Sequence, residues 1–233
     1  MSTSAGSELT LDAVQIVKVD LLEPPIGAMD LLDHAERGRA AAFVYARDRR
    51  RFVTAHACLR LTLGRLLGRP PEAFQFTTSP EGKPWLHEPQ IDLRFNLSHS
   101  GERALIAVTI GRDVGVDIEQ ERPIDVPEIG RRFLTAREYT ELQAMPESAR
   151  MRALYLGWTR KEAFVKGLGK GLAYPLNDID VCLGDGYTGQ VLRTCVGDPD
   201  ALNRWRVVSL DVDTGYAAAL AVEGQGWQVM FAS

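Results

Sequence analysis

Apolar and polar residues alternate over residues 13–21, and this period of two predicts a β-strand that follows a loose tail at residues 1–10. The apolar residues then take a helical spacing over residues 31–67, with a break expected near Gly38. Short segments follow, with turns predicted at 68–71 and 79–84 and strands at 74–76, 94–97, 104–110 and 113–118. The first part of the chain therefore reads as a strand, a long helical segment and a group of strands.

The same order occurs again further along the chain. Residues 127–166 have a helical pattern that is interrupted near Pro146. Strand patterns follow at residues 179–183, 189–193, 205–210, 216–222 and 228–231. The repeated order predicts an α+β fold made of two similar halves, residues 1–110 and residues 111–233.

Composition limits the class of protein. The 233 residues are 45% hydrophobic and 25% charged, which is typical of a globular protein with a real core. The net charge of −4 does not favour nucleic-acid binding, and no apolar run is long enough to span a membrane. Cys58, Cys182 and Cys195 lack metal-ligand spacing, and the start of the chain lacks a signal pattern. We therefore expect reduced thiols in a cytoplasmic protein.

One predicted helix carries an acid and a base on the same face. Trp158, Glu162 and Lys166 are spaced i, i+4, i+8, so their side chains follow one stripe. Glycines within residues 167–171 then allow the backbone to turn away from this stripe. Taken alone, the pattern fits a functional stripe and also fits an exposed Glu–Lys pair before a glycine cap.

Two further acids lie at the end of an apolar strand pattern. Asp117 and Glu119 are two residues apart, so they point to the same side of the strand and repel each other unless a cation lies between them. An exposed strand end with solvated acids is the alternative interpretation. With Glu162 they form an oxygen-only donor set, which suits Mg²⁺ or Mn²⁺ better than zinc. Lys166 beside them would suit a phosphate oxygen, so the set indicates a phosphoryl-transfer or diphosphate site.

Three other positions carry donors that could bind an anion. His99 lies between Ser98 and Ser100, and neighbouring side chains diverge too much to form a nucleophilic dyad. His99 is therefore either structural or, with the two serines, a hydrogen-bond donor to an anion. Lys83 lies in a Gly-Lys-Pro turn, and Arg51 belongs to a basic cluster that fits either a solvated helix face or an anion contact.

These residues fall into blocks that resemble a known family. The blocks are GKP at 82–84, FNLSHSG at 95–101, VGVDIE at 114–119, FLTARE at 133–138 and WTRKEAFVK at 158–166. Their order and spacing are similar to those of the 4′-phosphopantetheinyl transferases, and the length resembles the large, monomeric type that activates surfactin-like synthetases. The resemblance covers residues 45–172, and the last sixty or so residues carry no matching motif.

The resemblance implies a reaction between the two halves of the fold. Coenzyme A would bind at their interface, and a serine of an acyl or peptidyl carrier protein would attack its β-phosphate and release adenosine 3′,5′-bisphosphate. The residues matching Asp117, Glu119 and Glu162 would hold Mg²⁺ on the diphosphate, with Mn²⁺ as an alternative. Glu162 would also be the candidate base, directly or through a metal-bound water, and Lys166 would contact the transferring phosphate.

The resemblance also implies binding residues for the two substrates. The coenzyme would be held by residues matching Arg51, Lys83, Ser98, His99, Asp117, Glu162 and Lys166, with Lys83 and His99 near its 3′-phosphate. Carrier proteins are acidic, and the family binds them through the segment after the paired acids. The candidate docking residues are Arg122, Arg131, Arg132, Phe133 and Leu134.

Two other classes of protein fit part of the pattern. A metal-dependent nuclease would use a similar set of acids and lysine, but the net charge and the lack of a basic stripe with aromatic residues disfavour it. A coenzyme-A-binding module without catalytic activity is the non-enzymatic alternative. The presence of Asp117, Glu119, Glu162 and Lys166 argues against that alternative.

Overall fold

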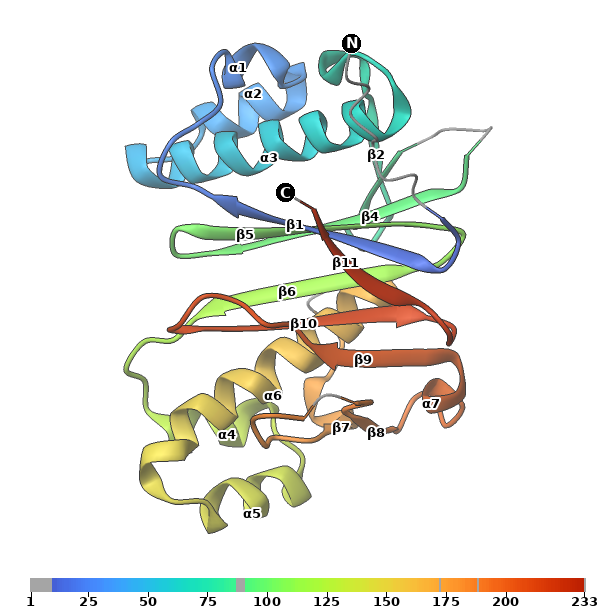
Figure 1. Cartoon of the computed structure of the whole chain (residues 1–233). Helices are drawn as coiled ribbons and strands as arrows, with labels where there is room; N and C mark the ends of the chain where they lie inside the picture. The colour runs from blue at the N-terminus through green and yellow to red at the C-terminus, as the bar shows by residue number, and fades with distance from the viewer. Residues whose placement is uncertain (1–9, 87–90, 172, 188, 233) are drawn as a thin grey trace.

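Figure 1 shows the computed structural model of the chain, which describes residues 10–86, 91–171, 173–187 and 189–232. Most of the predicted tail therefore lies outside the described residues. The elements of the first half are β1 (Ala13–Asp20), α1 (Ala28–Leu31), α2 (His34–Ala41), α3 (Ala46–Leu67), a 3₁₀ turn (Pro71–Ala73), β2 (Phe76–Thr78), β3 (Pro84–Leu86), β4 (Leu93–Ser100) and β5 (Arg103–Ile110). The elements of the second half are β6 (Val114–Gln120), α4 (Val126–Phe133), α5 (Ala136–Ala144), α6 (Glu147–Leu168), a 3₁₀ turn (Leu176–Asp178), β7 (Ile179–Val181), β8 (Leu192–Cys195), α7 (Ala201–Arg204), β9 (Trp205–Ser209), β10 (Tyr216–Glu223) and β11 (Gln228–Ala232). This mixture of helices and sheets confirms the predicted α+β class.

The helical segment of the first half differs from the prediction in the position of its break. Gly38 lies inside α2, and the chain leaves the helix at residues 42–45 instead. The side chain of Asp33 accepts from the backbone N–H of Glu36, and the Glu36 side chain accepts from the N–H of Asp33, so a capping box fixes the start of α2. An interior glycine costs a helix only about 1 kcal/mol, which is too little to end α2.

The long helical pattern of the second half is three helices. The predicted interruption near Pro146 is confirmed, because α5 ends at Ala144 and α6 begins at Glu147. A further interruption at residues 134–135 was not predicted. Thr135 and Glu138 form a second capping box there, which starts α5 as a separate helix.

The strands form two main sheets with the helices on their outer sides (Figure 1). The first sheet has the order β11-β1-β5-β4 and the second has the order β6-β10-β9. The final strand, β11, pairs in parallel with β1, so it joins the sheet of the first half although it follows the second half in sequence. Apolar side chains from both sheets, among them Ile16, Leu105, Val116 and Leu220, share one buried cluster. The two sheets are thus joined by a common core.

Two small features complete the fold. Cys58, Cys182 and Cys195 are all free thiols, the last two buried. Among the residues that the structure describes, no helix has both the length and the apolar character needed to span a membrane.

Candidate active site

Strand β6 and helix α6 pack closely together because Gly115 of β6 has no side chain. A Cβ atom on Gly115 of β6 would lie 2.1 Å from the carbonyl oxygen of Ala163 and 2.2 Å from the backbone nitrogen of Gly167. No side chain can be accommodated at these distances, so α6 packs directly on the backbone of β6. This contact places Glu162 and Lys166 beside the acids of β6.

Asp117 is the most buried of these acids and is bound by the lysine. Its side chain is 3% exposed, and the Lys166 ammonium donates to its Oδ1 atom at 2.6 Å. The Ser98 hydroxyl donates to the same oxygen at 2.8 Å, and Lys166 also donates to Ser98 Oγ at 2.9 Å. The second carboxylate oxygen, Asp117 Oδ2, is buried and has no hydrogen-bond partner among the described residues. A buried carboxylate oxygen in this condition is a candidate ligand for a cation.

Glu119 and Glu162 are half-buried, and the charge of Asp117 acts on both. Burial raises the pKa of Glu119, and the negative charge of Asp117 raises it further. The pKa of Glu162 is raised by the same two causes in the same order. In the described parts of the chain, no three His, Cys, Asp or Glu side chains converge closely enough to hold a metal ion. The three acids of the predicted donor set therefore do not converge on one point here, and Lys166 occupies one oxygen of Asp117, so the metal site stays a prediction.

Two adjoining cavities open between the halves and meet at Lys166. One has a volume of about 480 Å³ and is lined by Arg39, His56, Ser98, His99 and Lys166, among others. The other has a volume of about 410 Å³, and its lining includes Arg39, Lys83, Glu162 and Lys166. Lys166 of the second half thus lines both cavities together with residues of the first half. The location of the active site between the halves stays a prediction.

The cavity walls carry basic residues that the sequence analysis did not select, together with acidic residues such as Glu36 and Glu162. His99 lies on the first cavity wall, where removal from water lowers its pKa, followed by repulsion from His56 and Lys166. His56 is oriented by a contact of 2.7 Å between its Nδ1 atom and Glu36 Oε1. Arg39 is exposed and lines both cavities. Sequence reasoning missed Arg39 and His56, because each looks like an ordinary polar position on a helix.

Lys83 joins the two halves at the end of α6. Its ammonium donates to the carbonyl oxygen of Gly167 at 2.8 Å, and it lies 3.7 Å from the carboxylate of Asp113. Burial lowers its pKa, and Asp113 opposes this shift. The carbonyl groups at a helix C-terminus carry partial negative charge, which favours a lysine there. Lys83 thus has a structural contact in addition to its place on the second cavity wall.

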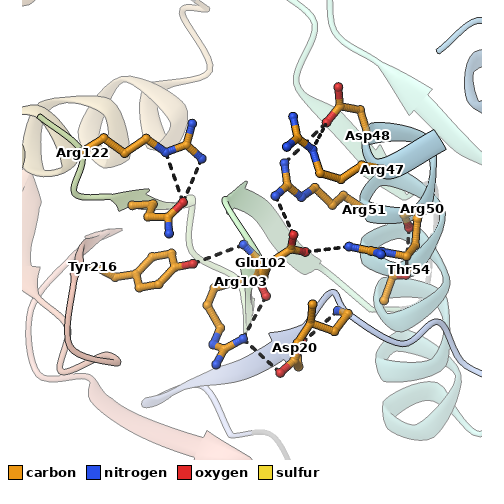
Figure 2. Close-up of polar contacts among 12 residues, drawn as sticks. Asp20, Arg47, Asp48, Arg50, Arg51, Thr54, Glu102, Arg103, Arg122 and Tyr216 are labelled. Atoms are coloured by element: carbon orange, nitrogen blue, oxygen red, sulfur yellow. Dashed lines mark hydrogen bonds and ion pairs between the residues drawn. The ribbon is translucent and has the colours of Figure 1, made fainter. Parts of the chain in front are cut away.

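Arg51 is engaged away from the cavities. Figure 2 shows its guanidinium group directed at Glu102, which Arg50 also contacts. The Arg51–Glu102 distance is 2.7 Å, and the hydrogen bonds from Arg51 hold the pKa of Glu102 below its usual value. The backbone N–H of Glu102 donates to the hydroxyl of Tyr216 from the second half. Arg51 does not line either cavity described above, so its proposed contact with the nucleotide receives no support from its position.

The candidate docking residues divide into two groups. Phe133 and Leu134 are 6% and 5% exposed and belong to the core under α6, so they cannot present their side chains to a partner here. Their apolar side chains, which suggested a docking contact, instead pack in the core that joins α4 to α6. Arg122, Arg131 and Arg132 are exposed. The prediction therefore needs correction for the two apolar residues.

Comparison with known proteins places both halves in one family. A family model described as the 4′-phosphopantetheinyl transferase superfamily matches residues 113–221. A second, described as 4′-phosphopantetheinyl transferase, N-terminal, matches residues 26–110. The 4′-phosphopantetheinyl transferase HetI of Nostoc sp. is 34% identical, with 96% of this chain and 93% of the relative covered. The chain belongs to the 4′-phosphopantetheinyl transferases.

A second curated relative agrees with this family. The 4′-phosphopantetheinyl transferase Sfp of Bacillus subtilis is 31% identical to this phosphopantetheinyl transferase over 82% of both chains. A crystal structure of the holo-[acyl-carrier-protein] synthase of Thermotoga maritima matches 48% of this chain and 63% of that chain, with 21% identity and a TM-score of 0.38. The protein is therefore an enzyme, a holo-carrier-protein synthase that transfers phosphopantetheine to carrier proteins.

Proposed function

We propose that this transferase uses coenzyme A and a divalent cation, Mg²⁺ or Mn²⁺, to modify a serine of an acyl or peptidyl carrier protein. The serine oxygen forms a bond to the β-phosphorus of coenzyme A, and the bond between that phosphorus and the bridging oxygen breaks. Adenosine 3′,5′-bisphosphate leaves, and the serine proton passes to a base of the enzyme. The observation that carries the proposal is the buried, unpartnered Oδ2 of Asp117 at the junction of the two halves.

Asp117, Glu119 and Glu162 are the proposed ligands of the cation. Their oxygen atoms match the hard donors that Mg²⁺ prefers. The raised pKa values of Glu119 and Glu162 reflect burial and the negative charge of Asp117, and a cation would relieve that repulsion. When bound, the ion would neutralise charge on the diphosphate.

Glu162 and Lys166 are the proposed residues for chemistry. Glu162 lines the second cavity, has a raised pKa and is one helical turn before Lys166, so it can accept the serine proton near the reacting phosphate. Lys166 lines both cavities and its side chain is 29% exposed, so its ammonium can reach a phosphate oxygen. Ser98 binds both Asp117 and Lys166 and would hold these two side chains in place.

Basic side chains on the cavity walls support a place for the nucleotide. Lys83, His99 and Arg39 would bind phosphate groups of the coenzyme, including the 3′-phosphate, because phosphate oxygens accept strong charge-assisted hydrogen bonds. Arg122, Arg131 and Arg132 are exposed and would attract the acidic surface of a carrier protein.

One assay tests the proposal. An apo carrier protein is incubated with the enzyme, coenzyme A and Mg²⁺, and its mass is followed together with the released nucleotide. The expected result is a gain equal to one phosphopantetheine group, with adenosine 3′,5′-bisphosphate formed in equal amount. Chelation of the metal and the variant Asp117→Asn should both abolish the gain. A mass gain that proceeds equally well in chelator would reject the cation.

A further inference from the structure

The two main sheets meet at their edge strands β4 and β6, which are not joined by a backbone hydrogen-bond ladder within the described residues. In the described chain β4 pairs only with β5 and β6 pairs only with β10, although β4 and β6 lie side by side (Figure 1). Unpaired N–H groups on a buried strand edge are costly. Here side chains of β4 accept from the backbone N–H groups of β6 at 2.9, 3.4 and 3.1 Å, in the pairs Asn96–Val116, Ser98–Ile118 and Ser100–Gln120.

The spacing of these pairs follows from the period of a strand. The N–H groups of alternate residues of β6 face β4, while every residue of β6 lies opposite a residue of β10. Alternate side chains of β4 likewise point to one side. Each acceptor therefore meets one N–H group, in register, and side chains replace the main-chain carbonyl groups of a ladder.

Two of these side chains bind the acids as well. Ser98 Oγ donates to Asp117 Oδ1 at 2.8 Å, and Ser100 Oγ donates to Glu119 Oε2 at 2.7 Å. A hydroxyl can accept from an amide and donate its proton to a carboxylate at the same time. Ser100 therefore fixes both the strand that carries Glu119 and the carboxylate itself.

The turn after Ser100 allows this close approach. Gly101 has φ +57, and a Cβ atom there would lie 2.4 Å from Gln120 Oε1 and 2.7 Å from the hydroxyl of Tyr216. Any other residue at this position would displace the ends of these two side chains and would be strained by the positive φ.

We infer that Asn96 and Ser100 are positioning residues for the metal-binding acids. Through their bonds to β6 they set its register against the first half, and Ser100 also orients Glu119 for the cation. The inference rests on the proposed function, because the positions of these acids matter in this way only if they bind a cation. It makes the cation site dependent on both halves, although its three proposed ligands all come from the second.

The test compares Ser100→Ala with Ser100→Thr and Asn96→Ala. The control is Ser148→Ala, which removes an exposed hydroxyl from the first turn of α6. Hydrogen exchange of backbone amides in the full-length, metal-free protein is measured by NMR. Loss of one hydrogen bond should speed exchange of its own amide about 2- to 10-fold. Ser100→Ala should affect Gln120, and Asn96→Ala should affect Val116.

The second measurement is the affinity for Mg²⁺, determined by calorimetry in the presence of coenzyme A. Removal of a hydrogen-bond partner of a metal ligand typically weakens metal binding about 10- to 100-fold. We expect a loss in this range for Ser100→Ala, restored affinity for Ser100→Thr, a smaller loss for Asn96→Ala and no change for Ser148→Ala. If Ser100→Ala does not fold, Ser100→Cys takes its place, because a thiol is similar in size and a weak hydrogen-bonding group.

The outcomes separate the inference from the proposed function. Unchanged exchange at Gln120 and unchanged Mg²⁺ affinity in the Ser100 variant would overturn the positioning role. Unchanged Mg²⁺ affinity in Asp117→Asn would overturn the proposed metal site instead. In that case exchange at Gln120 and Val116 still decides whether the two side chains hold β6.

Discussion

Replacement of Lys161 by methionine should destabilise the protein by about 3–5 kcal/mol, the usual cost of leaving one member of a buried ion pair without its partner. Lys161 and Glu138 are both 0% exposed, and the lysine ammonium lies 2.5 Å from Glu138 Oε2. The same ammonium donates to the carbonyl oxygens of Phe133 and Leu176 at 2.9 and 3.0 Å. One lysine thus ties α4, α5 and the turn after α6 to a single point.

The loss should depend on pH in a defined direction. Burial already raises the pKa of Glu138 above its ordinary value of 4.5, and the ammonium of Lys161 opposes this shift. Without the ammonium the pKa of Glu138 must rise further. A carboxyl whose pKa is raised on folding favours the folded state below its unfolded pKa, and this contribution is lost as the pH rises through the folded pKa. The deficit of the variant should therefore be largest near neutral pH and smaller in mild acid.

Urea unfolding of four proteins measures both effects. They are the wild type, Lys161→Met, Glu138→Gln and the double variant, each studied at about pH 7 and about pH 5. Removal of the charge of Glu138 in the double variant should recover part of the loss. Lys170→Met, at an exposed lysine just after α6, is the matched control and should change stability by less than about 0.5 kcal/mol. A loss below about 1 kcal/mol for Lys161→Met, with no dependence on pH, would refute the reasoning, since that is the range of an exposed pair.

Four further predictions concern the site. Glu162→Gln should retain coenzyme A but slow transfer about 10²- to 10⁴-fold at saturating Mg²⁺, and recovery to within about tenfold in excess Mg²⁺ would reduce Glu162 to a ligand. Lys83→Ala should weaken binding of coenzyme A more than binding of its 3′-dephospho form in calorimetry, and equal losses would exclude a 3′-phosphate contact. NMR titration should give His99 a pKa below 6.5 in the free protein, and adenosine 3′,5′-bisphosphate should raise it by supplying negative charge. Gly115→Ala should lower the melting temperature and the rate together, because its methyl group would meet the backbone of α6; wild-type stability would contradict this packing.

The relative directions of the acids within their strand and helix could be predicted from the sequence, because local periodicity determines them. Asp117 and Glu119 share a side of one strand, and Glu162 precedes Lys166 by one helical turn, so each pair could be placed without knowledge of the tertiary fold. The contact between the strand and the helix is long-range, and only the structure shows that it depends on the missing side chain of Gly115. These residues belong to the motifs that resemble the family.

Features that depend on the packing of distant segments could not be predicted in this way. Phe133 looks like an apolar docking residue in a basic segment, and only the position of α6 shows that it is in the core. Arg39 and His56 come from two helices whose polar faces gave no sign of a cavity. The pairing of β11 with β1 joins opposite ends of the chain, and a strand pattern contains no information about its partner.

The segment Asn96-x-Ser98-x-Ser100 was predicted only in part. From the sequence, Ser98 and Ser100 were expected only as possible anion donors beside His99. The structure shows that the alternating side chains match the N–H groups of another strand, whereas His99 lines a cavity, which Ser98 also lines. One strand can therefore carry residues for both functions, because neighbouring side chains along a strand point to opposite faces. A substitution of Ser100, which lines neither cavity, should change the join between the halves and the carboxylate of Glu119, and a substitution of His99 should change nucleotide binding.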